Sequence, residues 1–388
     1  MISCSYIENN INRHFSDNYN LFINSEMKNT NPSDCNFGLS TNSSISSFSS
    51  TSTILDTSKL AVTKSIEIHS GISGDCVDYI PTLNSFVIGD QEGYLSLWKY
   101  PQWKKISQIK CHASYICFVK YIADSKEIIT ASYDRTIQIH KVMKDKTIKT
   151  LKTLKNNNQI EAMLVLPEEN LLISGGPYMG LSFWDLHGYR LKGMLDTKGK
   201  AGVGQNILFI EKFQLLACGF LTGQISLYDV TNNFEELSTV DTQHEDWNIT
   251  IGFDPRYNLL YACVDFHCLK CWRITEERRL EYVAEYYFPG NNILSFEPCE
   301  LDGKEVILIT SVCSRVHVFD VSSKEFSYLL SKNYSRIRIF EQQNILILTS
   351  NQDSKIDIIE YQFPNTSASQ SWSEDAEIFD SIFDCEEL

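Results

Sequence analysis

The sequence predicts an all-β fold, a closed ring of seven four-stranded sheets, on two observations. The first is a strand–turn–strand pattern, clearest in LLACGFLTGQISLYDV (215–230), that recurs seven times. The third strands of the repeats align on Trp98, His140, Trp184, Tyr228, Trp272, Phe319 and Ile359, at steps of 42, 44, 44, 44, 47 and 40 residues. A hairpin repeated at this period is typical of a repeat architecture.

The second observation is a spare strand ahead of the first repeat. The seventh repeat supplies SRIRIFE, ILILTSN and KIDIIEY, and the chain then turns at Pro364 without an outer strand. LAVTKSIEIH (60–69) has strand-like alternation and no repeat of its own. We expect it to pair with the seventh hairpin, because closure of the ring removes two exposed sheet edges.

Each repeat contains four predicted strands, as the second one illustrates. Its strands are expected at 115–121, 127–133, 136–142 and 147–154. Each alternates or runs apolar for five to eight residues and is bounded by Asp, Ser, Lys or Asn. The third and fifth repeats match this pattern strand for strand, so the same four-stranded unit is expected throughout.

Three regions differ in composition. Residues 1–60 are polar, and 11 of the 14 residues in 40–53 are Ser or Thr, which predicts a disordered arm. Residues 61–361 carry the repeats. Residues 362–388 contain seven acidic side chains and no Lys or Arg, which predicts an acidic tail, either disordered or a short amphipathic helix.

The repeats resemble the WD-repeat β-propellers. The resemblance rests on Trp184-Asp185, on the relaxed versions Tyr228-Asp229 and Phe319-Asp320, and on the repeat period. It covers residues 62–361, although no repeat has every signature residue, and it implies a seven-bladed β-propeller. In that family a His, an Asp or Glu and the Trp of the third strand form a hydrogen-bonded network within each blade. The matching sets are His69 with Glu92 and Trp98, His112 with Asp134 but His140 in place of Trp, and His244 with Trp272 but Phe266 in place of Asp.

The composition and charge of the chain indicate in which compartment the protein works and which classes of partner it binds. The formal charge of −15 argues against a general nucleic-acid or anionic-membrane surface, although a local basic patch stays open. The first residues lack a signal-peptide pattern, and no apolar run approaches the ~18 residues of a membrane span. The twelve cysteines lack the close spacing of a disulfide framework. These features predict a cytoplasmic protein with reduced thiols, with the nucleus as the alternative compartment, and no nucleic-acid or membrane partner.

Signatures of catalysis are missing from the sequence. It contains no GxSxG, GxxxxGK or HExxH motif, so we expect no enzyme, no cofactor and no metal; a hydrolase at the channel mouth is the weaker alternative. The one CxxC, Cys268 to Cys271, lies in a predicted strand where residues three apart face opposite sides, which argues against a shared ion. Arg278-Arg279 lacks the glycine of the phosphoinositide-binding WD-repeat subfamily.

The expected function is therefore binding. Aromatic and basic residues gather at loops that share one face of a propeller: Tyr115, Tyr133, Arg135, Tyr178, Phe220, Trp247 and Phe266, with Lys198 and Lys200 nearby. The tail offers a second motif, Trp372, Phe379, Ile382 and Phe383, at roughly helical spacing. We expect a scaffold or adaptor that binds proteins or peptides as a subunit of a larger complex. The alternative is a reader of phosphorylated or acidic motifs in a ubiquitin-ligase, chromatin, trafficking or cytoskeletal assembly.

Overall fold

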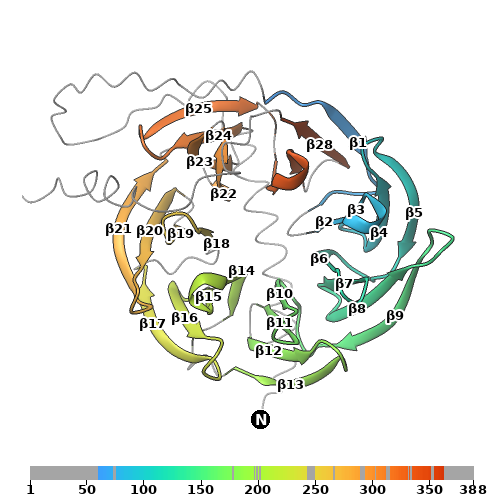
Figure 1. Ribbon diagram of the computed structural model, residues 1–388, viewed down its shortest axis with the longest axis horizontal. Helices are drawn as coiled ribbons and strands as arrows, with labels where there is room; N and C mark the ends of the chain where they lie inside the picture. Colours follow the sequence, from blue (N-terminus) through green and yellow to red (C-terminus); the bar gives the residue numbers. More distant parts are fainter. Residues whose placement is uncertain are drawn as a thin grey trace, which may run out of the picture.

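The computed structural model shows seven four-stranded antiparallel sheets, the blades, arranged around a central axis (Figure 1). The structure describes residues 60–72, 76–176, 179–195, 197, 200, 202–242, 250–264, 267–288, 293–301, 303–311, 315–330, 332, 334–350 and 354–361. In blades 1 to 6 the strands follow one another in chain order from the axis outward. The prediction of a seven-bladed β-propeller is confirmed.

Blades 1 to 4 each consist of four consecutive strands. Blade 1 contains β2 (Val77–Ile80), β3 (Ser85–Gly89), β4 (Tyr94–Lys99) and β5 (Lys104–Lys110). Blade 2 contains β6 (Ile116–Ile122), β7 (Glu127–Ser132), β8 (Thr136–Val142) and β9 (Ile148–Lys155). Blade 3 contains β10 (Ala162–Leu166), β11 (Leu171–Gly176), β12 (Met179–Asp185) and β13 (Arg190–Met194). Blade 4 contains β14 (Val203–Ile210), β15 (Leu215–Phe220), β16 (Gln224–Asp229) and β17 (Glu235–Asp241).

Blades 5 and 6 follow the same plan, and blade 7 has only three consecutive strands. Blade 5 contains β18 (Thr250–Asp254), β19 (Leu259–Val264), β20 (Cys268–Ile274) and β21 (Leu280–Tyr287). Blade 6 contains β22 (Ile293–Leu301), β23 (Lys304–Ser311), β24 (Arg315–Asp320) and β25 (Glu325–Leu330). Blade 7 contains β26 (Arg336–Phe340), β27 (Ile345–Thr349) and β28 (Lys355–Glu360).

The first strand of the chain completes blade 7. β1 (Lys64–Glu67) pairs antiparallel with β28, and Lys64 lies opposite Ile358 in their register. Figure 1 shows β1 outside β28, between blades 7 and 1. The predicted closure of the ring is confirmed, and it leaves β28 with a partner on both sides.

The core lies in layers between neighbouring blades. β11, β15, β19 and β27 are buried along their whole length, because each sheet packs against a neighbour on both faces. One layer, for example, joins Ile129 and Ile139 of blade 2 to Leu172 and Trp184 of blade 3. The outermost strands are largely exposed, so the rim of the ring faces solvent.

Tight turns connect the first and second strands on one side of the ring. Three of them are single turns of 3-10 helix: η2 (Pro81–Leu83), η3 (Glu211–Phe213) and η4 (Glu341–Gln343). Each is followed by a residue in the left-handed region: Asn84, Gln214 and Asn344, with φ of 45°, 52° and 52°. Asn tolerates this region better than most residues, which explains its use at two of these positions.

The two thiols of the CxxC lie on opposite faces of β20, as predicted. Cys268 packs in the layer between blades 4 and 5, and Cys271 in the layer between blades 5 and 6. Burial raises the pKa of the Cys271 thiol. Residues 1–59 and 362–388 lie outside the described residues, so the predictions of an arm, a tail and their boundaries stay predictions.

Candidate interaction surfaces

A buried chain of hydrogen bonds braces blade 2. His112 Nδ1 lies 3.0 Å from an Asp134 oxygen, and His112 Nε2 lies 2.7 Å from the Thr130 hydroxyl. The same hydroxyl lies 2.8 Å from His140 Nε2, and His140 Nδ1 lies 3.0 Å from the Thr150 hydroxyl. This is the network that the family resemblance implies for His112, with His140 in the place of Trp.

One placement of the protons gives every hydrogen bond in this series both a donor and an acceptor. His112 donates from Nδ1 to Asp134 and accepts from Thr130, while His140 donates from Nε2 to Thr130 and accepts from Thr150. The His140 ring is neutral in this arrangement. Burial and the neighbouring His112 lower the pKa of His140 to about 3, which agrees with a neutral ring.

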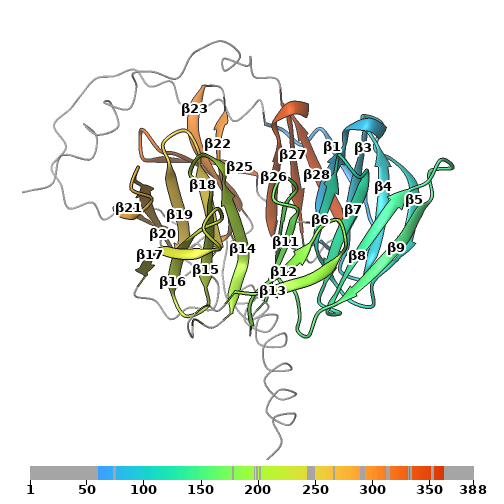
Figure 2. The same cartoon turned by 60° about the horizontal axis from the view of Figure 1, so that its bottom comes forward.

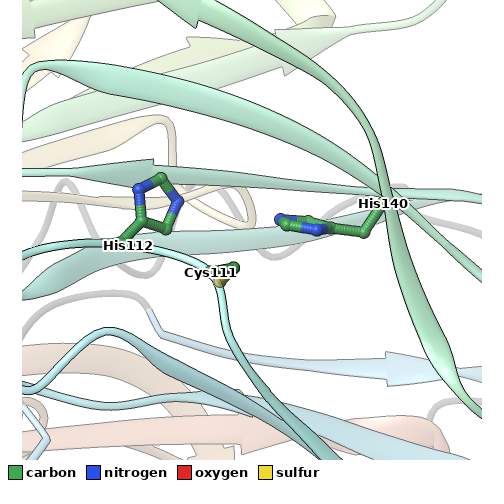
Figure 3. A group of neighbouring side chains, drawn as sticks. All are labelled: Cys111, His112 and His140. Carbon is green, nitrogen blue, oxygen red and sulfur yellow. The ribbon is translucent and has the colours of Figure 1, made fainter.

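Cys111, His112 and His140 also form a cluster with ligand atoms within 4.8 Å of one another (Figure 3). Figure 3 shows His140 reaching from β8 toward the other two side chains. Burial raises the pKa of Cys111 to about 12, so the thiol is protonated in the absence of a metal ion. The Thr130 hydroxyl already bonds to a ring nitrogen of each histidine. The cluster therefore fits a structural brace better than a metal centre.

Related contacts recur in the neighbouring blades. Trp184 donates from Nε1 to the Ser174 hydroxyl across 2.9 Å in blade 3. His69 Nε2 lies 3.0 Å from a Glu92 oxygen beside blade 1. His244 lies outside the described residues. Trp98 of blade 1 donates from Nε1 to Ser96 of its own strand across 2.8 Å, so the predicted network forms in blade 2 and not as predicted in blade 1.

Two of the predicted loop-face aromatics form a pair. The rings of Tyr115 and Tyr133 lie 4.8 Å apart in a T-shaped arrangement, and both are partly buried. Tyr133 donates its hydroxyl proton to Glu161, which precedes the first strand of blade 3. Arg135 lies two residues after Tyr133 in the same turn, and it is exposed and has a φ of 69°. The structure brings these three predicted residues together at one edge of blade 2.

Two of the residues predicted on or near the loop face, Phe220 and Lys200, have side chains that point into the propeller. Phe220, the last residue of β15, is 0% exposed in the layer between blades 3 and 4, so its predicted place on the binding face is wrong. Lys200 points inward, with Nζ 2.6 Å from a Glu236 oxygen and 5.4 Å from the Phe220 ring centre. The remaining candidates lie outside the described residues: Tyr178, Lys198, Trp247, Phe266, Trp372, Phe379, Ile382 and Phe383.

The central channel contains a cavity of about 710 Å³. Its wall is built from the first strands of blades 4 to 7 and combines apolar rings, Phe253 and Phe296, with Glu297, Arg336 and Arg338. A second cavity of about 370 Å³ at the η4 side also includes Glu297. The channel is thus a hollow with apolar and charged walls.

The outer strands of blades 1 and 2 carry a surface that sequence reasoning missed. It consists of nine exposed lysines of β5, the end of β8, the β8–β9 hairpin and β9, here named the basic rim: Lys104, Lys105, Lys110, Lys141, Lys144, Lys146, Lys149, Lys152 and Lys155. β5 and β9 lie side by side in both views, and the β8–β9 hairpin projects beyond them (Figures 1 and 2). The rim is therefore one continuous surface.

The charges of the basic rim are not neutralised locally. Residues 99–155 contain 13 basic and 4 acidic side chains, a net charge of +9 in a chain of −15. Within the described part of the chain, no ion pair involves any of the nine lysines. Lys141 and Lys149 even lie directly opposite each other in neighbouring strands, which is an unfavourable placement of like charges. The rim is suited to an anionic partner.

Apolar side chains are interspersed with these lysines. The described residues expose seven large apolar side chains, and five of them lie on the outer parts of blades 1 to 3: Ile106, Met143, Leu151, Leu191 and Met194. Lys152 connects blade 2 to blade 3, because its Nζ donates to the Gly188 carbonyl across 2.9 Å. This bond joins β9 to the β12–β13 turn, so the apolar side chains of β13 belong to the blade next to the basic rim.

Comparisons with known proteins relate the chain to one named group. It is 29% identical over 161 residues to a U3 small nucleolar RNA-associated protein 15 homolog of Xenopus laevis, covering 40% of this chain and 30% of that protein. It is 28% identical over 142 residues to the homolog of Gallus gallus, covering 35% and 26%. The matches thus span less than a third of either relative. No protein-family model matches the chain.

The seven blades and the His–Thr–His brace agree with what the resemblance to WD-repeat propellers implies. The fold is a seven-bladed β-propeller that resembles theirs. The total charge conceals the basic rim of this propeller, because acidic residues elsewhere outnumber the lysines. The signal lay in KKISQIK (104–110) and KVMKDKTIKTLKTLK (141–155). Among the residues that the structure describes, no helix is long and apolar enough to cross a membrane.

Proposed function

We propose that this propeller is a non-catalytic platform that holds partner proteins within a ribonucleoprotein complex. The observation that carries the proposal is the basic rim, an exposed surface of lysines and apolar side chains on a closed ring. Apolar side chains on a surface stabilise protein contacts when they are buried, and unpaired lysines select an acidic partner. The relatives, which are named for association with U3 small nucleolar RNA, supply the class of complex.

The loop face is the second proposed contact surface. Tyr115, Tyr133 and Arg135 form its described part, and from the sequence we expect Tyr178, Trp247 and Phe266 to belong to it as well. Tyr and Arg are frequent in the energetically important centres of interfaces. Because Tyr133 is already bonded to Glu161, Arg135 is the residue here that is most available to a partner.

The relatives also bear on two expectations, the compartment and the absence of nucleic acid as a partner. We propose that the platform works in the nucleus, which was the alternative to the expected cytoplasmic location. Nucleic acid then becomes a neighbour, although total charge argues against it as a general partner. We place the contact of this chain with proteins, and an RNA contact is the competing outcome of the experiment below.

A second candidate function is recognition of acidic or phosphorylated motifs. The specific observation in its favour is the density of lysines without ion pairs on β9 and its hairpin. Lysine ammonium groups bind phosphates and carboxylates as point charges. Motif recognition would be one way in which the platform chooses its partners.

Affinity purification of the full chain tests the platform proposal. The rim variant carries Lys144→Glu and Lys149→Glu, and a matched control carries the same charge change at Lys126 and Lys324, which are exposed elsewhere. We expect the rim variant to lose its protein partners several-fold and the control to keep them, with or without ribonuclease treatment. Capture that is equal for both variants, or that disappears with ribonuclease alone, would overturn the proposal.

A further inference from the structure

The basic rim has the chemistry of a site for an acidic chain segment with bulky apolar side chains. Lys144, Lys146 and Lys149 surround the exposed Met143 and lead to Leu151, which is 47% exposed at a bulge in β9. Leu191 and Met194 on β13 are 53% and 50% exposed. Exposed apolar groups of this size among charges are typical of an interaction site.

The apolar component distinguishes a peptide from nucleic acid. Contacts to a phosphate backbone come from Lys and Arg, hydroxyl and amide side chains and backbone N–H groups, and they do not need leucine or methionine. Five of the seven large apolar side chains that the described residues expose lie on or beside the basic rim. A partner that supplies both carboxylates and apolar side chains buries both components.

The chain itself contains such a segment. Residues 371–388 read SWSEDAEIFDSIFDCEEL and contain seven Asp and Glu, no Lys or Arg, and the bulky residues Trp372, Ile378, Phe379, Ile382 and Phe383. Its charge is opposite to that of the rim, and its apolar residues alternate with acidic ones in the same way. Opposite charge and shared apolar content make the two surfaces complementary.

The length of chain after the last blade permits the contact. The last described residue, Tyr361, follows β28 in blade 7, and blade 2 is the second blade onward around the ring (Figure 1). The acidic residues of the segment, Glu374 to Glu387, follow Tyr361 by 13 to 26 residues, which span up to ~45 to ~85 Å when extended. A compact domain of about 300 residues is only ~50 Å across, so most of the segment can lie on the rim at blade 2.

We propose that residues 371–388 bind in cis to the part of the basic rim on blade 2 and to the exposed apolar residues of β13 in blade 3. The carboxylates pair with the lysines of β9 and its hairpin, and the aromatic and aliphatic side chains cover Leu151, Leu191 and Met194. The contact relieves the repulsion between Lys141 and Lys149, which face each other across β8 and β9. The inference needs only the rim and the segment, and it does not depend on the platform role.

Carbodiimide cross-linking of the full chain tests this contact, because the reagent joins carboxylates to amines that form ion pairs. Tryptic mapping is expected to find links from Asp and Glu in 374–387 to the rim lysines, and none above background to Lys126 or Lys324. The double variant Lys144→Glu and Lys149→Glu should reduce the rim links by about tenfold, and the double variant Lys126→Glu and Lys324→Glu should leave them unchanged. Circular dichroism confirms that both variants are folded.

Three outcomes would overturn the proposal. Links spread evenly over all exposed lysines would show that the segment has no preferred site. Links between copies in a mixture of unlabelled and ¹⁵N-labelled chains would show that the segment belongs to a second copy. The absence of rim links, together with binding of a labelled polyuridine RNA that the rim variant loses, would assign the rim to nucleic acid.

Discussion

Tyr133 donates its hydroxyl proton to Glu161 across 3.1 Å, and this bond joins the β7–β8 turn of blade 2 to the start of blade 3. Burial raises the pKa of Glu161 to about 7, although the bond from Tyr133 opposes the shift. The unfolded chain ionises this carboxyl near 4.5, so the folded chain holds the proton over a higher range of pH.

A pH dependence follows from this shift. As the pH rises from about 4.5 to about 7, Glu161 ionises in the unfolded state first, which lowers the free energy of unfolding by up to ~3 kcal/mol. Glu161→Gln keeps an acceptor for Tyr133 and has no charge to bury. Its melting temperature relative to wild type should therefore be higher at pH 8 than at pH 5. Glu168→Gln, on an exposed loop, is the control, and an equal change in both variants would contradict the assignment.

Because the Thr130 hydroxyl bonds to both histidines of the blade 2 brace, we expect its removal to destabilise the fold more than removal of the Thr130 methyl group. Thr130→Val has the same shape but leaves a ring nitrogen of both His112 and His140 without its partner. Loss of partners for buried polar groups should lower the free energy of unfolding by ~1–3 kcal/mol. Thr130→Ser retains the hydroxyl and should lose less, as measured by urea unfolding. Equal losses in the two variants would show that the methyl group matters and the hydrogen bonds do not.

The ionised carboxylate of Asp357 is expected to stabilise blade 7, where the ring closes. Burial favours its neutral form, but hydrogen bonds from Lys332, Ser65 and Tyr334 outweigh burial and lower its pKa. A lowered carboxyl pKa stabilises the fold above the unfolded pKa of 3.8, and the contribution is lost as the pH falls through the folded value.

Asp357→Asn should therefore lower the free energy of unfolding by ~1–3 kcal/mol at pH 7, because Lys332 and Tyr334 lose a charged acceptor. The difference from wild type should become smaller below pH 3.8. Thermal unfolding at a series of pH values measures both effects. A difference that stays constant down to pH 3 would rule out an ionised Asp357 as the source.

The arrangement of strands was accessible from sequence because each repeat shows its own apolar pattern. In the second repeat the strands expected at 115–121, 127–133, 136–142 and 147–154 are β6 to β9, shifted by at most one residue. The spare strand at 60–69 was informative because an unpaired edge is unfavourable and blade 7 had one strand too few.

The surface was harder to predict, for two physical reasons. Phe220 ends a strand that is buried on both faces, and only the neighbouring blade decides whether such a ring lies inside. The basic rim is formed by outer strands from two blades, and the total charge of −15 conceals its local excess of +9. The position of His140 in the network follows from the family resemblance, but its partners Thr130 and Thr150 were identified only in the structure.

The pairing of β1 with β28 closes the ring on which the account depends, and an introduced disulfide tests it most directly. Glu67 lies opposite Lys355, at a separation that suits a cross-strand disulfide, and the two are 288 residues apart. In a chain with Glu67→Cys and Lys355→Cys, mild oxidation should link the two introduced thiols, as detected by peptide mapping. The melting temperature should rise by several degrees because so long a loop is closed. Failure of the link to form in folded protein, or a link that leaves the melting temperature unchanged, would contradict a propeller closed by its first strand.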